Sequence, residues 1–290
     1  MPHVLKHPAL PDYFLTSAGD RNHVADYEGG AVVVLPNQAA AIDTAFWSAL
    51  PIDDFAALKK FKTAFGLDAP PPRDRLHADL LAVVEQDDLA ARMTDKIIEL
   101  YDALMPLYRT VFAGYRFPKT RAIFRLNTIM AENVHFDTYR EPLPHHFARM
   151  FVNLDDRPRI WHTSWPIREA MARYGDLVAP ETLSADANSL WNELSWRIFG
   201  KSSKQCWDSE PRHIAFFDPG DVWIVDSRQV AHQIFYGRRA VSIDFEVDIA
   251  SMHDPSTYYL TLAEEFRRTR LDQIAQRSQP SPASSHQEAP

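Results

Sequence analysis

The chain has 290 residues, of which 46% are hydrophobic and 12% aromatic. This length and composition predict one large or two modest globular domains with a real core, and they exclude a disordered protein. The formal net charge of −8 argues against a general nucleic-acid-binding protein. The single cysteine, Cys206, excludes an internal disulfide and a multi-cysteine zinc or iron–sulfur site, and it fits a reducing compartment.

The N-terminal sequence MPHVLKHPALPDYF does not have the charged and then apolar layout of a secretory signal peptide. The longest apolar runs, such as GAVVVLP, are too short to cross a bilayer. These features predict a soluble, cytoplasmic protein without a transmembrane segment. Peripheral contact with a membrane stays open as an alternative.

The first part of the chain is predicted to be mainly helical. A short buried strand is expected at residues 29–36. Apolar residues at helical spacing predict a helix over 38–66, and a stronger pattern predicts two helices over 76–113, of which Pro106 should kink or end the second. Residues 1–117 are therefore expected to form a strand and helices that pack on the core.

Beyond residue 118 the sequence changes to short alternating runs separated by Pro, Gly and Asp, a pattern typical of strands. A helical insert is expected at 166–207, a final helix at 257–275 and a disordered tail at 276–290. The expected strands have the sequences AIFRLNTI, NVHFDTY, HFARMFVNLD, PRIWHTSW, HIAFF, DVWIVD, HQIFY and AVSIDFEVD.

About eight short strands with helices around them predict an α+β fold with a jelly-roll core. In this interpretation residues 118–275 form a double-stranded β-helix, the cupin-like jelly roll, with an N-terminal helical layer against it. The two parts are expected to act as a single functional unit.

One of the expected strands contains a His and an Asp two residues apart. In a strand, residues two apart point to the same face, so His135 and Asp137 can hold one ion. His232, at the start of a later strand, is the best candidate for a third ligand. Two histidines and one carboxylate with three open positions form the non-haem Fe(II) arrangement. An H-x-D tripeptide alone is a weak signal, for which a surface turn is the other interpretation.

Several segments resemble the Fe(II)/2-oxoglutarate-dependent dioxygenase superfamily. These are EGGAVVVLP near the start, HFD itself, ARMFVNLDDRPRIW directly after it, and FFDPGDVWIVDSRQVAHQIFYGRRA near the end. Within the superfamily the chain is most similar to the Kdo hydroxylases, which act on the 3-deoxy-octulosonic sugar of bacterial lipopolysaccharide. The similarity of order covers about residues 28–265.

The resemblance implies a hydroxylase that attacks an unactivated C–H bond of a small polar or acidic substrate, with Fe(II), 2-oxoglutarate and O2. Asp137 fills the position that halogenases of this superfamily leave vacant, so hydroxylation or desaturation is expected instead of halogenation. The segment TYREPLP after Asp137 departs from the more apolar segment of the Kdo hydroxylases. An amino-acid or natural-product hydroxylase of the same superfamily is therefore the alternative.

The distal carboxylate of 2-oxoglutarate needs a fixed cation, preferably a bidentate arginine. Many relatives place it about ten residues after the distal histidine, followed by a serine, and here Ser242 fits but the arginine does not. Arg149 lies on the strand where JmjC-type relatives place their anchoring base, on one face with Asn153. Arg149 is favoured and Arg238, in the turn after His232, comes second. An ordinary salt bridge is the alternative for both arginines.

The mouth of the site is expected to be rich in arginine, which would suit an acidic substrate such as a sugar acid or an amino acid. Solvated arginines at a sheet edge are the other interpretation. The candidates are Tyr139, Arg140, Asn127, Arg125, Arg159 and Trp161.

Two further functions are consistent with the sequence. A cupin-type metal dioxygenase without 2-oxoglutarate would need no anchoring arginine. A non-catalytic jelly-roll binding protein would contain the H-x-D tripeptide by accident. No nucleic-acid partner is expected in either case.

Overall fold

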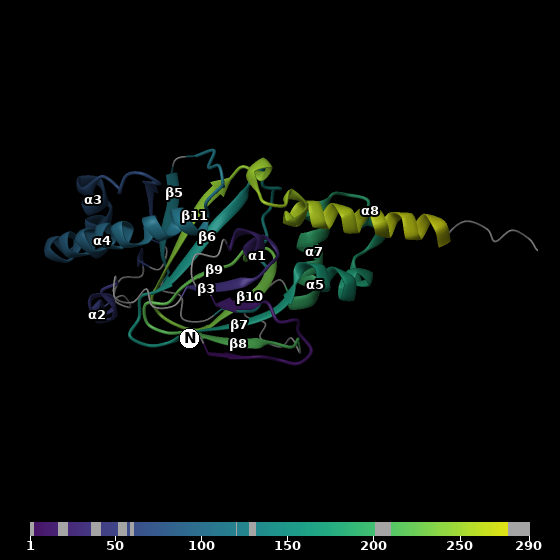
Figure 1. Cartoon of the computed structure of the whole chain (residues 1–290), viewed down its shortest axis with the longest axis horizontal. Coiled ribbons are helices and arrows are strands. Elements are labelled where there is room, and N and C mark those ends of the chain that lie inside the picture. The colour runs from purple at the N-terminus through teal and green to yellow at the C-terminus, as the bar shows by residue number, and fades with distance from the viewer. Residues whose placement is uncertain are drawn as a thin grey trace, which may run out of the picture.

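The structure is a computed structural model of the chain (Figure 1). It describes residues 3–16, 23–35, 42–51, 57–58, 61–119, 121–127, 132–200 and 210–277, with 121–127 described for the backbone alone. Cys206, the end of the predicted insert 166–207 and nearly all of the predicted tail 276–290 lie outside the described residues.

Two sheets form the centre of the fold. The strand order of the seven-stranded sheet is β2-β3-β9-β6-β11-β5-β4, and that of the four-stranded sheet is β1-β8-β7-β10. The strands of the larger sheet are β2 Phe14–Thr16, β3 Val32–Leu35, β4 Lys62–Gly66, β5 Arg121–Asn127, β6 His146–Asn153, β9 Val222–Ile224 and β11 Ala240–Val247. Those of the smaller sheet are β1 His3–Leu5, β7 Arg159–Pro166, β8 His213–Phe217 and β10 Val230–Tyr236.

Helices lie at both ends of the sheets (Figure 1). The helices α3 and α4 lie beside β5, β6 and β11, whereas α5, α7 and α8 gather at the opposite end. The helices are α1 Val24–Glu28, α2 Thr44–Ala49, α3 Arg73–Val84, α4 Asp87–Val111, α5 Ile167–Tyr174, α6 Pro180–Leu183, α7 Ala187–Phe199 and α8 Tyr259–Arg277, with short 3-10 turns at Gly175–Leu177, Ile249–Ser251 and Pro255–Thr257. No helix of the described residues is long and apolar enough to cross a membrane.

The alternation of β11 separates an apolar face from a polar one. Val241, Ile243 and Phe245 are fully buried in one core with residues of α3 and α4. Ser242 and Asp244 point to the other face of the strand, since side chains alternate along it. That face is directed toward the four-stranded sheet. Between the two sheets lies a second core, which contains Trp161 of the four-stranded sheet and Trp223 of the seven-stranded sheet. The space between the sheets therefore receives the polar side chains of β11.

Most of the predicted elements are confirmed. The α+β class, the strands β6 to β11 and the helices over 76–113 and 257–275 all form, with a break between α3 and α4 at Glu85, which has a left-handed backbone (φ 55°). The helix α4 runs through Pro106 to Val111, so it does not end at this proline. Pro106 is exposed, and water can satisfy the carbonyl group that loses its helical partner.

Two other predictions are wrong. The helix predicted over 38–66 is instead the short helix α2 and the strand β4, whose residues Thr63 and Phe65 are buried in alternation and which pairs with β5. The strand predicted around His135 is reduced to a single bridge to β10. The periodicity of the sequence could not predict these two outcomes, because whether a short segment forms a strand depends on pairing with a strand that is distant in the sequence.

A buried ion cluster fixes the turn that precedes β10. The Arg228 guanidinium donates to both carboxylate oxygens of Asp226, at 2.9 Å each, and to His146 Nδ1 at 2.8 Å. It also lies 4.9 Å from the centroid of the Tyr259 ring. Burial, reinforced by Arg228, lowers the pKa of His146 from its ordinary 6.5 to about 3. His146 is therefore held neutral inside the fold.

This cluster should make the fold sensitive to acid. As the pH falls from 6.5 toward 3, the unfolded chain takes up a proton on His146 that the folded chain rejects. The unfolding free energy should then fall by up to about 1.4 kcal/mol per pH unit from this residue. His146→Gln keeps an acceptor for Arg228 but cannot titrate, so it should flatten the slope by about one proton. Urea unfolding at a series of pH values measures this.

The matched control for this prediction is His253→Gln at an exposed position, which should keep the slope of the unmodified protein. Equal slopes for His146→Gln and the unmodified protein would contradict the assignment of acid sensitivity to His146.

Candidate metal centre

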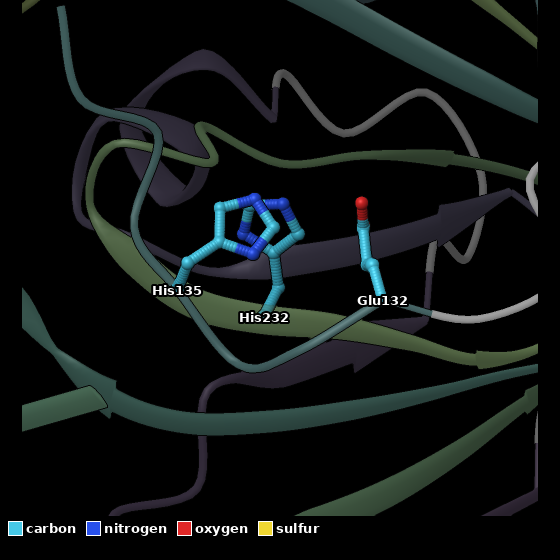
Figure 2. Close-up of side chains that lie close together, drawn as sticks. All are labelled: Glu132, His135 and His232. Carbon is cyan, nitrogen blue, oxygen red and sulfur yellow. The ribbon is translucent and has the colours of Figure 1, made fainter. Parts of the chain in front are cut away.

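Two histidines from distant parts of the chain lie side by side. His135 and His232 form an isolated antiparallel bridge, in which each backbone N–H donates to the other residue's carbonyl at 3.0 and 2.9 Å. Their ring centroids are 4.6 Å apart (Figure 2). Nδ1 of His135 lies 2.8 Å from the Asn133 carbonyl oxygen, and Nδ1 of His232 lies 3.2 Å from that of Val230. Because a proton on Nδ1 satisfies these carbonyls, the Nε2 lone pairs remain for a cation.

Asp137 brings a carboxylate to the same point. Its Oδ1 lies 3.5 Å from Nε2 of His135 and 4.0 Å from Nε2 of His232. Its backbone N–H donates to the Ser227 carbonyl at 2.9 Å, which holds the segment against the turn before β10. The structure thus brings together the three residues that the sequence predicts as metal ligands.

Glu132 brings a second carboxylate, which the sequence analysis missed. Ligand atoms of Glu132, His135 and His232 all lie within 4.8 Å of one another, and Figure 2 shows the Glu132 side chain next to the two rings. Burial raises the pKa of Glu132. The one feature of the sequence that could have indicated Glu132 as a ligand is its position three residues before His135, but no periodic pattern distinguishes it from other acidic residues. Two imidazoles and two carboxylates are a donor set that suits a divalent metal ion.

Arg149 on β6 orients Asp137. Its Nε donates to Asp244 Oδ1 at 2.7 Å, and its Nη1 contacts both Asp137 Oδ2 and Ser227 Oγ. Ser227 Oγ also donates to Asp137 Oδ2 at 2.6 Å, and Nη2 reaches Tyr139 Oη at 3.4 Å. These contacts occupy Oδ2 of Asp137 and leave Oδ1 directed at the imidazoles.

The charges around the two imidazoles differ. Burial opposes ionisation of Asp137, but Arg149 and the histidines outweigh it and hold the pKa of this carboxyl well below its ordinary value. Burial, helped by His135, lowers the pKa of His232 to about 4. Burial also acts on His135, but Asp137 outweighs it and raises the pKa of His135 to about 9. A metal ion would therefore replace a proton on His135 and find His232 already neutral.

Some of the other predicted residues lie beside this cluster. The Trp161 ring is stacked on that of His232, with centroids 5.3 Å apart and planes at 24°. Tyr139 touches Arg149. A cavity of about 320 Å³ opens on His135 and Asp137, and its opposite wall includes Ser195 and Trp196 of α7. The site is therefore open to a small molecule on one side.

Other predicted residues lie apart from the cluster or outside the described side chains. Asn153 is occupied in the turn after β6, where its amide donates to the carbonyls of Arg157 and Phe217 at 2.9 and 3.0 Å. Arg140 and Arg238 are exposed.

Ser242 is buried on β11, opposite Phe151 of β6 and Arg125 of β5. Arg125 and Asn127 lie on β5, where the backbone register pairs Asn127 with Ala240, and their side chains are outside the described part of the structure.

No family model matches the sequence, and no curated protein matches it. Among solved structures, the chain is similar to the Kdo hydroxylase KdoO, a non-haem Fe(II) α-ketoglutarate-dependent dioxygenase, in complex with succinate and Fe(III). The TM-score is 0.55 at 16% identity, over 90% of this chain and 96% of that chain. The structure of the same enzyme in complex with α-ketoglutarate and Fe(III) has a TM-score of 0.55 at 15% identity, again over 90% of this chain and 96% of that chain. This likeness concerns the fold, and at that level it confirms the resemblance that the sequence motifs predicted.

The geometry predicts which residues a metal ion needs. His135→Ala and His232→Ala should each weaken Co(II) binding by at least about tenfold, since each removes one imidazole ligand. Asp137→Asn should weaken binding more than Glu132→Gln, because Arg149 and Ser227 fix the Asp137 carboxylate. Calorimetric titration of the metal-free protein measures all four affinities.

The exposed His253→Ala is the control and should bind Co(II) like the unmodified protein. A Glu132→Gln variant that loses more affinity than Asp137→Asn would transfer the role of third ligand from Asp137 to Glu132.

Proposed function

We propose that the chain is a non-haem Fe(II)- and 2-oxoglutarate-dependent dioxygenase that hydroxylates an unactivated C–H bond of a small polar or acidic substrate. The observation that supports this most strongly is the convergence of His135, His232 and the Asp137 carboxylate on one point. The site lies in a two-sheet fold that is shared with a dioxygenase of this kind. In this proposal residues 118–275 are the jelly-roll core and residues 1–117 support it as part of one functional unit.

In this function His135, Asp137 and His232 hold the iron on one side and leave the other side open. When bound, iron supplies the activation of O2, with 2-oxoglutarate consumed to succinate and CO2 as the substrate is hydroxylated. The protein orients the ligands: backbone carbonyls fix each Nδ1, Trp161 supports the His232 ring, and Arg149 fixes Asp137. Such support keeps the ligands within the narrow range that the chemistry needs.

The substrate would enter through the cavity between the segment 132–138 and α7. Tyr139 and the exposed Arg140 follow this segment, and a basic side chain there suits an acidic substrate. We propose Kdo of lipopolysaccharide as this substrate, because the solved relative is a Kdo hydroxylase. An amino acid or another natural product is the alternative within the same chemistry.

A second candidate function follows from Glu132. If both carboxylates bound the metal, fewer positions would remain open, as in cupin-type dioxygenases that use no 2-oxo acid. Oxygenation that persists without any 2-oxo acid would favour that function. A protein that binds no divalent metal would instead be a non-catalytic binding protein.

The proposed reaction should be visible as succinate formation. The purified protein, given Fe(II), O2, 2-oxoglutarate and ascorbate as the reductant that replaces a substrate, should release succinate. His135→Ala and His232→Ala should reduce release to the background rate, since each loses a metal ligand. Chromatographic or enzymatic detection of succinate provides the measurement, with His253→Ala as the active control. Undiminished turnover in either alanine variant would remove that histidine from the site.

The substrate is tested by a screen of the same reaction. Kdo-lipid A should increase the rate of succinate release and gain one oxygen atom by mass spectrometry, whereas free amino acids should not. Free sugar acids serve as the intermediate case, because they offer the carboxylate without the lipid. No stimulation by any lipid-linked Kdo would eliminate Kdo of lipopolysaccharide as the substrate and leave the reaction class in place.

A further inference from the structure

Glu132 brings a second carboxylate to the candidate metal centre, in addition to that of Asp137. The ligand atoms of Glu132, His135 and His232 lie within 4.8 Å of one another, and Figure 2 shows the Glu132 side chain beside the two rings. Within the described part of the chain, no other side chain forms a hydrogen bond or an ion pair with this carboxylate. Glu132 can therefore bind a metal ion, or turn away from it, without breaking a contact to another side chain.

The backbone of Glu132 is fixed against β10. Its N–H donates to the Ile234 carbonyl at 2.9 Å, and its own carbonyl accepts a hydrogen bond of 2.7 Å from Nε2 of Gln233. Rotation about the side-chain bonds can move the carboxylate while the backbone stays in place. The reach of the carboxylate is thus set by the length of the side chain.

The Asp137 carboxylate is held much more firmly. Its Oδ2 accepts a hydrogen bond of 2.6 Å from Ser227 Oγ and contacts the Arg149 guanidinium. Its backbone N–H donates to the Ser227 carbonyl at 2.9 Å. These contacts keep Oδ1 next to the imidazoles whether or not another ligand is present. Of the two carboxylates, Glu132 is the one that can be exchanged.

The proposed reaction leaves no place for Glu132 on the metal. His135, Asp137 and His232 would leave three positions open on an Fe(II) ion. A chelating 2-oxo acid fills two of them, and O2 needs the third. If Glu132 occupies that third position, it must leave before O2 can bind.

The cavity beside the centre supplies a means of displacing Glu132. Glu132 lines this cavity of about 320 Å³ together with His135, Asp137 and the α7 residues Ser195 and Trp196. A molecule that fills the cavity comes to lie against the Glu132 side chain. Entry of the substrate can thus be coupled to the opening of one position on the metal.

We propose that Glu132 is an exchangeable fourth ligand, which occupies the position that O2 needs until the substrate enters the cavity. This inference rests on the proposed function and adds a control over when O2 is activated. Such a control prevents 2-oxoglutarate from being consumed, and the protein from being oxidised, while no substrate is bound. Because Glu132 is attached to the chain, it competes for the position at a high effective concentration.

Nitric oxide can replace O2 as a probe of this position, so that no turnover occurs. The anaerobic protein, loaded with Fe(II) and 2-oxoglutarate, is titrated with nitric oxide, and the paramagnetic complex is measured by electron paramagnetic resonance. Glu132→Ala should bind nitric oxide at least about tenfold more tightly than the unmodified protein, because the attached competitor is removed. Equal affinities would overturn the proposal.

Two further variants separate ligation from charge. Glu132→Asp keeps the negative charge but is one bond shorter, and contacts with Gln233 and Ile234 hold its backbone. It should therefore bind nitric oxide as tightly as Glu132→Ala does. An affinity equal to that of the unmodified protein would mean that only the charge matters, and it would overturn the role of Glu132 as a ligand. Glu141→Ala, at an exposed position, is the control and should bind like the unmodified protein.

The same titration in the presence of a substrate tests the displacement. At a concentration that stimulates succinate release, Kdo-lipid A should tighten nitric oxide binding by the unmodified protein to the level of Glu132→Ala, and it should leave that variant unchanged. Equal tightening in both proteins, or none in the unmodified protein, would show that the substrate does not displace Glu132 and would overturn the proposal.

Failure of this inference differs from failure of the proposed function. If the unmodified Fe(II)-loaded protein binds no 2-oxoglutarate, the proposed function is overturned, and the role of Glu132 with it. If the unmodified protein and Glu132→Ala both bind 2-oxoglutarate but do not differ in their affinity for nitric oxide, the proposed function stands and Glu132 does not control the O2 position. Binding of 2-oxoglutarate by Glu132→Ala also shows that this variant is folded and loaded.

Discussion

The pair of backbone hydrogen bonds between His135 and His232 fixes the geometry on which the rest of the site depends. The segment around His135 is not a full strand, so these two bonds and the one from Asp137 to Ser227 hold it against the four-stranded sheet. Each imidazole then meets a backbone carbonyl through Nδ1. Both Nε2 atoms are left facing the same point, where the Asp137 carboxylate also arrives. The candidate metal centre thus depends on backbone pairing between two segments that are far apart in the sequence.

Charge compensation explains much of what surrounds this point. Several arginines are buried in the fold, and a buried charge requires a partner. Arg228 is neutralised by Asp226, and Arg149 by Asp137 and Asp244. These pairs lock the turn before β10 and the carboxylate of the metal centre. In the described part of the chain, Nε and Nη1 of the buried Arg159 have no hydrogen-bond partner.

The helices determine which face of the chain is available to a ligand. The helices α3 and α4 cover the apolar face of the seven-stranded sheet and leave its polar face toward the site. At the other end, α7 holds the segment after the H-x-D tripeptide: Asn188 and Asn192 donate to the Tyr139 carbonyl at 3.0 and 2.8 Å. The Phe136 and Trp191 rings lie 4.4 Å apart. The insert is therefore a wall of the cavity, and it supports the segment that follows the H-x-D tripeptide.

The sequence by itself determined the elements whose signal is local. Alternation in 240–247 predicted β11 and its two faces, and the H-x-D spacing with His232 predicted the residues that converge. Tertiary structure alone decided the rest. Residues 62–66 became a strand because β5 pairs with them, and Glu132 joined the histidines because the chain folds back there. Which arginine is compensated, Arg149 or Arg159, depends on acidic groups brought from other strands. Periodicity encodes which face a residue takes, but the partner it meets there depends on contacts between distant segments.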